Sequence, residues 1–424
     1  MPSNKRTIHF IGIGGAGMSA IAKVLLEAGN TITGSDLKRS EATARLARMG
    51  ATIYIGHRAK NLKHPDLVVV SSAIPATNVE LAAAKEAGIP IVQRGEMLAE
   101  LMDDRKGIAV AGAHGKTTTT SMISLVLERA GLDPTVLIGG ELNDIGGNAK
   151  VGRGEYLVAE ADESDGSFLK LRPHIAVVTN VEDDHLDYYG SVEKIAAAFA
   201  TFVARVPGTG LAVLCADNPT AAHIAGVCQR RTVTYGLDNP ATYEARNISH
   251  RTLHSDFDVF ERGAYLGSLS LSVPGRHNIL NALATVAVAR EVGVDFAVVR
   301  EALAVFHGVH RRFELLGEVG GVYVVDDYGH HPTEIKATLS AAKLGRFSRI
   351  ICVFHPHRYT RTKFLHKEFG AAFGQADELI ITGIYSAGET PIAGVSSELI
   401  VDAVAAQDGP QPVYIPELKH IVPY

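Results

Sequence analysis

The sequence has few of the features that mark secreted, membrane-spanning or nucleic-acid-binding proteins. Its 424 residues include only three cysteines, Cys215, Cys228 and Cys352, and their spacing matches no metal or redox motif, which favours a reducing compartment. No stretch approaches the roughly 20 uninterrupted apolar residues of a membrane span. The apolar run after Lys5 and Arg6 is broken by glycines, so it does not resemble a secretion signal. We therefore expect a cytoplasmic protein without a membrane span.

An excess of positive charge is also missing. The chain carries 41 basic and 46 acidic residues, for a formal net charge of −5, which argues against a nucleic acid as its partner. Tryptophan is absent and aromatic residues make up 6%, yet the hydrophobic fraction of 46% suffices for globular cores. A chain of this length predicts about two to four domains. We expect small-molecule substrates and a monomer or weak homodimer.

The first predicted domain, residues 1–104, alternates apolar strands with helical segments. Such alternation predicts parallel βαβ units and therefore an α/β fold. The strands are expected at residues 8–13, 31–35, 67–71 and 89–92, and the helices at residues 19–28 and 41–49.

A glycine turn follows the first of these strands. Residues 12–17 read G-I-G-G-A-G, and Asp36 ends the second strand, where a ribose-binding carboxylate belongs. Alone, this pattern is typical of an NAD-dependent dehydrogenase. The glycines specify only a pyrophosphate at a helix N-terminus, so any nucleoside diphosphate fits them equally well. A tight turn without a ligand is the remaining alternative.

A second glycine turn opens the next predicted domain, residues 105–307. The strand at residues 108–111 runs into G-A-H-G-K-T-T, and an apolar helical pattern follows directly. This order of strand, glycines, lysine, hydroxyl and helix is that of a phosphate-binding loop, in which Lys116 reaches the terminal phosphates and Thr117 ligates magnesium. The loop is shorter than usual, because Val110 stands where the first glycine of the common motif lies.

Two further strands of this domain end in polar residues. Glu160 follows the strand at residues 156–159, and His185 follows the strand at residues 175–179. Because ligands bind beyond the carboxyl ends of parallel strands, we expect both residues to share one crevice with Lys116. Thr117 and Glu160 suit magnesium, whereas His185 is an unusual magnesium ligand and fits a polar loop equally well. The acidic run at residues 162–165 is expected to be a solvated loop.

A long apolar helix is predicted at residues 279–292, near the end of this domain. Asn278 stands just before it and either caps the helix or reads an adenine edge with its amide.

The third predicted domain, residues 308–424, again alternates strands and helices. The strands are expected at residues 322–326, 349–354, 378–382 and 413–415. Histidines and arginines follow them, which suggests an anionic ligand such as a carboxylate or phosphate. These residues are Arg312, Asp327, His330, His331, His355, His357, Arg358 and Arg361. Zinc is disfavoured, because no cysteine or spaced carboxylate completes the histidine pairs.

Taken together, the motifs resemble the Mur ligases of peptidoglycan synthesis. The resembling blocks lie in the same order over nearly the whole chain, at residues 12–19, 112–119, 160–168, 180–190, 274–281, 311–314, 326–332 and 356–361. The block at 180–190, N-V-E-D-D-H-L-D-Y-Y-G, is closer to the branch that adds L-alanine than to the recycling branch that adds a tripeptide.

The resemblance implies an ATP-dependent ligase with three domains. A Rossmann-like domain at 1–104 binds the UDP of UDP-N-acetylmuramate, and a mainly parallel, P-loop-type domain at 105–307 binds ATP and Mg²⁺. A Rossmann-like domain at 308–424 holds the amino acid, and it is expected to be shortened because the family continues through another strand and helix. The expected reaction joins L-alanine to the lactyl carboxylate. The alternatives are a tripeptide-adding ligase, an NAD-dependent dehydrogenase and a non-catalytic nucleotide-binding regulator.

The expected site residues fall into four groups. The catalytic group is Lys116, Glu160, His185, Asp327 and His330. The ATP-binding group is Gly112, Ala113, His114, Gly115, Lys116, Thr117, Thr118, Asn278 and Arg312. The substrate-binding group is Gly14, Gly15, Ala16, Gly17, Asp36, Ser72, Arg358 and Arg361. The metal ligands are Thr117, Glu160 and His185.

Overall fold

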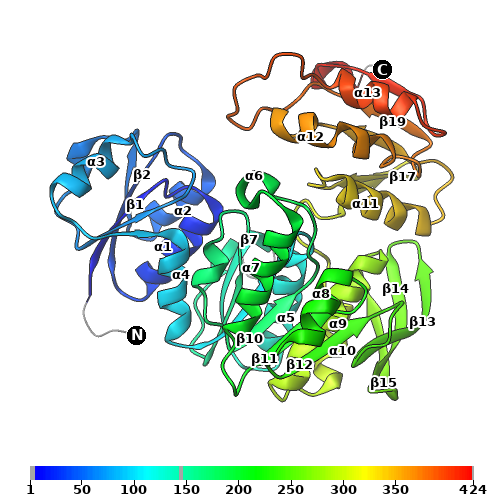
Figure 1. Cartoon of the computed structure of the whole chain (residues 1–424), viewed down its shortest axis with the longest axis horizontal. Helices are drawn as coiled ribbons and strands as arrows, with labels where there is room; N and C mark the ends of the chain where they lie inside the picture. The colour runs from blue at the N-terminus through cyan, green and yellow to red at the C-terminus, as the bar shows by residue number, and fades with distance from the viewer. Residues whose placement is uncertain (1–4, 143–146, 423–424) are drawn as a thin grey trace. The chain divides into compact units, whose positions relative to one another are not determined.

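The computed structural model describes residues 5–142 and 147–422 (Figure 1). The chain divides into two compact units. The first runs to residue 246 and adds residues 258–269 and 280–310, whereas the second comprises residues 247–257, 270–279 and the chain from residue 311. Among the described helices, none has the length and apolar character that crossing a bilayer requires. The domain boundaries at 104/105 and 307/308 stay predictions.

The N-terminal part of the first unit is a parallel sheet, as predicted, but it has five strands and not the four expected. Its strand order is β3-β2-β1-β4-β5. The strands are β1 (Thr7–Ile11), β2 (Thr31–Asp36), β3 (Thr52–Ile55), β4 (Leu67–Val70) and β5 (Ile91–Gln93). The helices are α1 (Ala16–Glu27), α2 (Glu41–Arg48), α3 (Val79–Glu86) and α4 (Arg94–Asp103), and η1 is a 3₁₀ turn (Ala59–Asn61). Because β1 lies between β2 and β4, its carboxyl end is the point where such sheets bind ligands.

The chain continues into a ten-stranded sheet, most of which belongs to the first unit. The order is β15-β14-β13-β12-β11-β10-β6-β9-β7-β8, and neighbours from β12 to β7 are parallel. The central strands are β6 (Lys106–Ala111), β9 (Tyr156–Glu160), β10 (Ile175–Val178), β11 (Leu211–Cys215) and β12 (Thr232–Gly236). One edge holds β7 (Thr135–Leu142) and β8 (Gly147–Lys150), and the other holds β13 (Tyr243–Arg251), β14 (His254–Glu261) and β15 (Ala264–Leu271).

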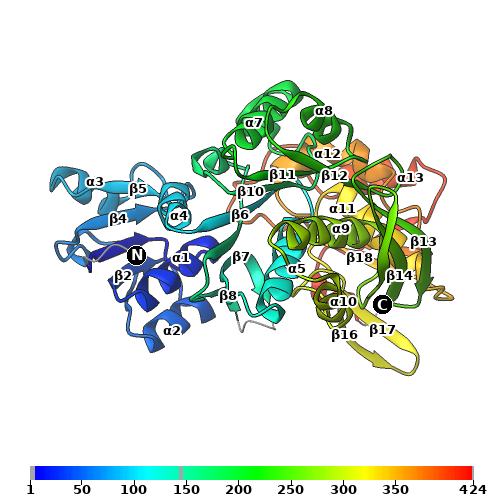
Figure 2. The same cartoon turned by 90° about the horizontal axis from the view of Figure 1, so that it is seen from below.

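Helices cover both faces of this sheet, which is why its central strands are apolar throughout. Figure 2 shows α7 (Val192–Ala204) and α8 (Pro219–Val227) on one side of β10–β12, with α5 (Lys116–Arg129) and α10 (Phe296–Ala304) on the other. The remaining elements are the 3₁₀ turn η3 (Ser167–Lys170) and the helices α6 (Leu186–Tyr189) and α9 (Arg276–Glu291).

A cluster of aromatic rings ties the loop after β9 to α7. The Phe168 ring lies 5.1 Å from Phe199 and 5.2 Å from Phe202 between centroids, and all three side chains are buried. Burying a phenylalanine contributes about 2–3 kcal/mol. The cluster therefore anchors the chain just beyond the acidic run at residues 162–165.

The second unit combines a β-hairpin with a small parallel sheet. The sheet is β18 (Ile351–Phe354), β19 (Glu378–Ile381) and β20 (Pro412–Tyr414), in that order. The hairpin is β16 (Glu314–Val319) and β17 (Val322–Asp326). The other elements are α11 (Pro332–Leu344), α12 (Tyr359–Gly370), α13 (Glu398–Ala405) and the 3₁₀ turn η4 (Leu418–His420).

The predicted place of the strand at 322–326 was wrong. It was expected to open the alternating pattern of the C-terminal sheet, but it pairs antiparallel with β16. Gly320 and Gly321, with φ of +60° and +80°, form the connection. Two successive positive φ values are typical of the two-residue hairpin turn. The prediction missed this hairpin because it assumed that strands and helices alternate throughout the domain.

Candidate functional site

The carboxyl ends of β6, β9 and β10 lie beside one another, as predicted. Val110 of β6 pairs with Glu160 of β9 on one side and with Val177 of β10 on the other. The loops that leave these strand ends carry Lys116, Glu160 and His185. One edge of the sheet thus presents a lysine, a carboxylate and an imidazole.

The loop between β6 and α5 needs its two glycines. Gly112 has φ of +139°, and a Cβ there would lie 2.0 Å from the Thr179 hydroxyl. Gly115 has φ of +83°, and a Cβ there would lie 2.8 Å from Oδ1 of Asn281. Left-handed backbone and close packing both exclude other residues. Thr117 and Thr118 then lie in the first turn of α5, which begins at Lys116.

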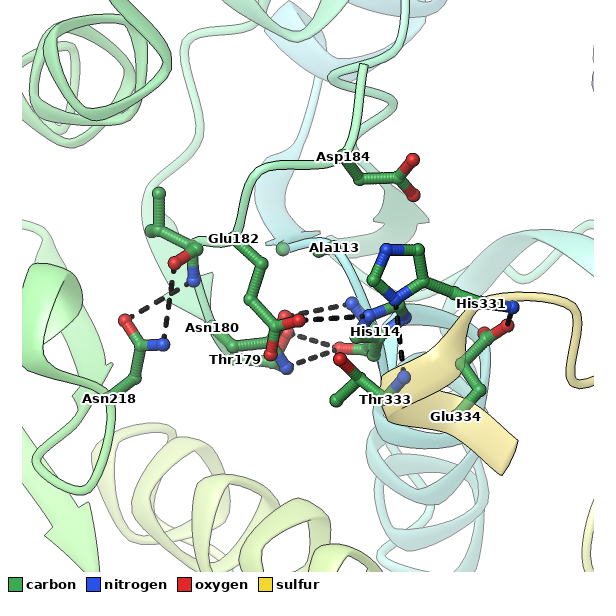
Figure 3. Close-up of polar contacts among 12 residues, drawn as sticks. Ala113, His114, Thr179, Asn180, Glu182, Asp184, Asn218, His331, Thr333 and Glu334 are labelled. Atoms are coloured by element: carbon green, nitrogen blue, oxygen red, sulfur yellow. Dashed lines mark hydrogen bonds and ion pairs between the residues drawn. The ribbon is translucent and has the colours of Figure 1, made fainter. Parts of the chain in front are cut away.

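The strand end of β10 holds this loop in place (Figure 3). His114 donates its backbone N–H to Oδ1 of Asn180 at 2.8 Å. The His114 carbonyl accepts from the Asn180 amide at 3.0 Å and from the Thr179 hydroxyl at 2.6 Å. Gly112, Ala113 and His114 are therefore shaped by contacts with the neighbouring strand end, whereas Gly115 packs against Asn281 of α9.

Lys116 is held by three oxygens. Its ammonium donates to the carbonyls of Gly112 at 2.5 Å and Ala113 at 3.3 Å. It also forms an ion pair with Oε1 of Glu163 at 2.7 Å. Burial acts to lower the pKa of Lys116, but the Glu163 carboxylate outweighs it and the pKa is raised. The lysine is cationic, and all three of its donors are engaged.

Glu163 is the site residue that sequence reasoning missed. The acidic run was expected to be a solvated loop, but Glu163 is only 3% exposed, so that prediction was wrong for this residue. Its carbonyl accepts from the Tyr189 hydroxyl at 2.6 Å, and its Oε1 lies 3.8 Å from Nε2 of His185. Phe168, buried a few residues further on, was the signal that this loop turns inward.

Glu160 and Asp162 have different surroundings. Oε1 of Glu160 accepts the backbone N–H of Gly139 at 2.7 Å. Asp162 pairs with Arg94 of α4, with the guanidinium nitrogen 2.8 Å from the carboxylate. Arg94 therefore joins the N-terminal sheet's last helix to the acidic loop after β9.

One cavity is lined both by the first glycine turn and by Lys116, the residue that follows Gly115. Its volume is about 370 Å³, and it opens between the first turn and the strand ends of the larger sheet. The residues that line it include Gly15, Ala16, Gly17, Ser71, Ser72, Arg94, Lys116, Glu160 and Asp162. Predicted substrate-binding residues thus share a single space with Lys116, a member of the predicted ATP-binding group.

The first glycine turn is fixed by the end of β2. The Ser35 carbonyl accepts the backbone N–H groups of Gly12 at 2.8 Å and Ile13 at 3.0 Å. The Asp36 carboxylate accepts the N–H of Gly14 at 2.8 Å. In this structure Asp36 shapes the turn, and its contact with a ribose stays a prediction.

Asn278 lies inside α9 and not before it. The helix begins at Arg276, and the Asn278 amide donates to the Pro274 carbonyl at 2.7 Å. The capping alternative was therefore wrong, because the helix starts three residues earlier than its apolar pattern. Contact with adenine stays a prediction.

The second unit gathers the predicted residues that follow β17. The Asp327 carboxylate accepts backbone N–H groups of Phe313 at 2.8 Å and Gly329 at 2.6 Å, and burial raises its pKa. Arg312 pairs with Glu334 at 3.1 Å. Glu334 also accepts the backbone N–H of His330 at 3.0 Å and, as Figure 3 shows, that of its neighbour His331.

A second group in this unit follows β18. The His357 ring lies 5.5 Å from the His330 ring, and its Nδ1 lies 3.1 Å from Nη1 of Arg361. Arg358 precedes α12 with φ of +72°, and its N–H donates to the Tyr385 carbonyl at 2.8 Å. Burial, and then the neighbouring His330 and Arg361, lower the pKa of His357 to about 4. Asp327, His330, Arg358 and Arg361 are thus placed after two strand ends of one unit.

Comparison with known proteins assigns the whole chain to one family. The family model described as "Mur ligase family, catalytic domain" matches residues 7–106, "Mur ligase middle domain" matches 110–289, and "Mur ligase, glutamate ligase domain" matches 311–424. A UDP-N-acetylmuramate–L-alanine ligase from Pelotomaculum thermopropionicum is 58% identical over 99% of this chain and 91% of its own.

Two solved structures are similar over their lengths. The UDP-N-acetylmuramate–alanine ligase MurC from Thermotoga maritima has a TM-score of 0.84 and 33% identity, covering 98% of this chain and 92% of its own. The murein peptide ligase from Psychrobacter arcticus has a TM-score of 0.74 and 28% identity, covering 99% and 92%. The two glycine turns, the second of which leads into Lys116, and these matches lead to one conclusion: the chain belongs to the Mur ligase family.

Proposed function

We propose that this protein joins L-alanine to the lactyl carboxylate of UDP-N-acetylmuramate and converts ATP to ADP and phosphate. The observation that carries the proposal is the cavity that the first glycine turn and Lys116 line, because it brings a diphosphate-binding turn and a phosphate-binding lysine to one reaction centre. The similarity to alanine-adding relatives, at 50–58% identity, favours L-alanine as the second substrate.

The chemistry explains why two nucleotides are needed. A carboxylate does not react with an amine near neutral pH, because oxide is too poor a leaving group. Transfer of the terminal phosphoryl group of ATP to a carboxylate oxygen gives an acyl phosphate and ADP. The amine of L-alanine then attacks the carbonyl carbon and loses a proton, and phosphate leaves with the carboxylate oxygen that accepted the phosphoryl group.

The chain's contribution is positioning and charge neutralisation. Lys116 exchanges its bond to Glu163 for the terminal phosphates of ATP, with the N-terminus of α5 behind it. The first glycine turn presents the start of α1, at Ala16 and Gly17, to the UDP pyrophosphate. Because the carboxylate and the terminal phosphoryl group are bound next to each other, the transfer between them is effectively unimolecular, which lowers the entropic part of the barrier.

The donor set beside Lys116 fits Mg²⁺. Glu163 presents Oε2, a buried oxygen with no hydrogen-bond partner among the residues that the structure describes. Hard oxygen donors are what this ion prefers. We propose that Thr117, Glu160 and His185 hold the ion with Glu163 nearby. When bound, Mg²⁺ supplies neutralisation of phosphate charge.

The second unit is proposed to hold the amino acid. Arg358 and Arg361 suit its carboxylate, since guanidinium groups bind carboxylates in a bidentate fashion. Asp327 and His330, which follow β17, are proposed to assist amine or phosphate binding, and Arg312, which precedes β16, is proposed to contact ATP. Asn278 is proposed to contact the adenine. The unpaired cysteines of the described chain agree with a cytoplasmic protein.

A tripeptide-adding ligase is the second candidate, since the murein peptide ligase from Psychrobacter arcticus covers nearly the whole chain. The dehydrogenase alternative leaves Lys116 and its buried partner Glu163 without a role, and the regulator alternative leaves the shared cavity without one. Neither is proposed further.

A phosphate-release assay separates these candidates. The protein is incubated with ATP, Mg²⁺ and UDP-N-acetylmuramate, and L-alanine, glycine, L-serine and the tripeptide are compared. We expect release that requires both the sugar nucleotide and an amino acid, and that is fastest with L-alanine. Fastest release with the tripeptide would favour the recycling ligase. Phosphate release that does not depend on the sugar nucleotide would contradict the proposal.

A further inference from the structure

A fully buried carboxylate lies on α3, in the N-terminal part of the first unit, and it does not line the cavity. Glu80 is the second residue of α3 and is 0% exposed. Most other buried residues of this domain are apolar. A buried charge is costly unless it is fully hydrogen-bonded, and an apolar side chain of similar size serves stability as well or better. Its presence therefore calls for a role other than packing.

The Glu80 carboxylate accepts hydrogen bonds from several elements of the domain. Oε1 accepts from the Asn61 amide at 2.5 Å and from the Arg58 backbone N–H at 3.0 Å. Oε2 accepts from the Ser35 hydroxyl and lies 3.4 Å from Nε2 of His9. One side chain thus joins α3 to β1, to β2 and to the segment after β3.

His57 completes this network at the end of β3. Its Nδ1 lies 2.8 Å from the Ser35 hydroxyl oxygen and 3.6 Å from Oε2 of Glu80. On the other side, His9 contacts the Thr33 hydroxyl at 2.7 Å. The Ser35 side chain is therefore held between a carboxylate and an imidazole and has little freedom to move.

Ser35 is also the residue that shapes the first glycine turn. Its carbonyl accepts both N–H groups at the start of that turn, from Gly12 and Ile13. The next residue, Asp36, holds Gly14, where a Cβ would approach its carboxylate to 2.8 Å. A single residue, Ser35, thus connects Glu80 to the turn: its hydroxyl bonds Glu80 and its carbonyl bonds the turn.

We propose that Glu80 is a positioning residue for the sugar nucleotide. It fixes Ser35 and, through the Ser35 carbonyl that binds the Gly12 and Ile13 N–H groups, the conformation of the turn that presents the start of α1 to the pyrophosphate. The inference rests on the proposed function in one respect, that this turn binds UDP. It assigns Glu80 no contact with the ligand and no part in the chemical step.

The test compares Glu80→Gln with Glu86→Gln, a matched change at an exposed position of the same helix. Binding of UDP and UDP-N-acetylmuramate is measured by calorimetry, and the KM for each substrate and kcat are measured in the ligase assay. For Glu80→Gln we expect the Kd and KM of the sugar nucleotide to rise about tenfold, the scale of one charge-assisted hydrogen bond. The KM of ATP and kcat should stay within about twofold of wild type.

Ser35→Ala is the second variant, and it removes the hydroxyl link but leaves Glu80 bonded to Asn61 and Arg58. It should raise the same Kd even if Glu80→Gln folds poorly. Unchanged sugar-nucleotide affinity in either folded variant, or a loss confined to stability and kcat, would overturn the inference. If the wild-type protein binds UDP but lacks ligase activity, the proposed function fails while the inference stands or falls on the Kd values. If the wild type does not bind UDP, both fail.

Discussion

Replacing Glu163 by glutamine should tighten the binding of ADP in the absence of divalent metal. In the structure the Lys116 ammonium is 2.7 Å from the Glu163 carboxylate, which occupies the donor that a phosphate would take. Nucleotide binding must therefore compete with this ion pair. Glutamine keeps the shape of the side chain and a weaker hydrogen bond, but it removes the charge.

The size of the effect follows from the difference between the two bonds. A hydrogen bond to a charged partner contributes about 1.5–3 kcal/mol, and a neutral one contributes about 0.5–1.5 kcal/mol. The substitution thus removes about 1–2 kcal/mol of competition, which corresponds to a roughly 5- to 30-fold lower Kd. Loss of repulsion between the carboxylate and the phosphates acts in the same direction.

Calorimetric titration of ADP in EDTA measures this change directly. The matched control is Glu155→Gln, because Glu155 also pairs with a lysine, Lys106, at 3.0 Å but on the surface. Its ADP affinity should equal that of wild type. Equal or weaker ADP binding by Glu163→Gln would refute the reasoning, since it would mean that Glu163 keeps hold of Lys116 while the nucleotide is bound.

Four further predictions concern single residues. Lys116→Ala should lower kcat by about 100- to 1,000-fold in the ligase assay and leave UDP binding intact, and full activity would show that the lysine is misassigned. Gly115→Ala should abolish ADP binding by calorimetry, because its φ is +83° and the new Cβ would meet Asn281 at 2.8 Å; wild-type affinity would contradict this. Burial works to raise the pKa of Glu80, but its hydrogen bonds lower it to about 2, below the unfolded value of 4.5. Ionisation of Glu80 therefore contributes about 3 kcal/mol to the free energy of unfolding above pH 4.5, and this contribution is lost as the pH falls towards 2. The difference in Tm between wild type and Glu80→Gln should narrow between pH 5 and pH 3. A constant difference in Tm would contradict the lowered pKa of Glu80. His357, whose pKa burial lowers to about 4, should show no imidazole titration by NMR between pH 7 and pH 5, and a midpoint near 6.5 would be the opposite result.

The N-terminal sheet was predictable because its signals are local. The strand that ends at Ile11 is apolar, the glycines follow at once, and the next helix is amphipathic, so each element agrees with its neighbours. The same local logic placed Lys116 at the start of α5 and Glu160 at the end of β9. The short strand β3 and the edge strands β13–β15 were not predicted, because they lack a long apolar run.

Buried charges were harder to predict than glycine turns. Glu163 stands among acidic residues that are normally solvated, and only the tertiary contact with Lys116 makes it a site residue. Glu80 and His9 belong to a helix and a strand whose other residues explain those elements fully, so nothing local indicates that the two side chains meet. Such pairs depend on the order of strands in the sheet, which the residue pattern does not encode.

Isotope transfer tests the central claim most directly. UDP-N-acetylmuramate labelled with ¹⁸O in the lactyl carboxylate is incubated with the protein, ATP, Mg²⁺ and L-alanine, and the released phosphate is analysed by mass spectrometry. The account predicts that each phosphate carries one oxygen from the carboxylate, since that oxygen leaves with the phosphoryl group. Amide product formed together with unlabelled phosphate would contradict an acyl phosphate and, with it, the roles assigned to the shared cavity.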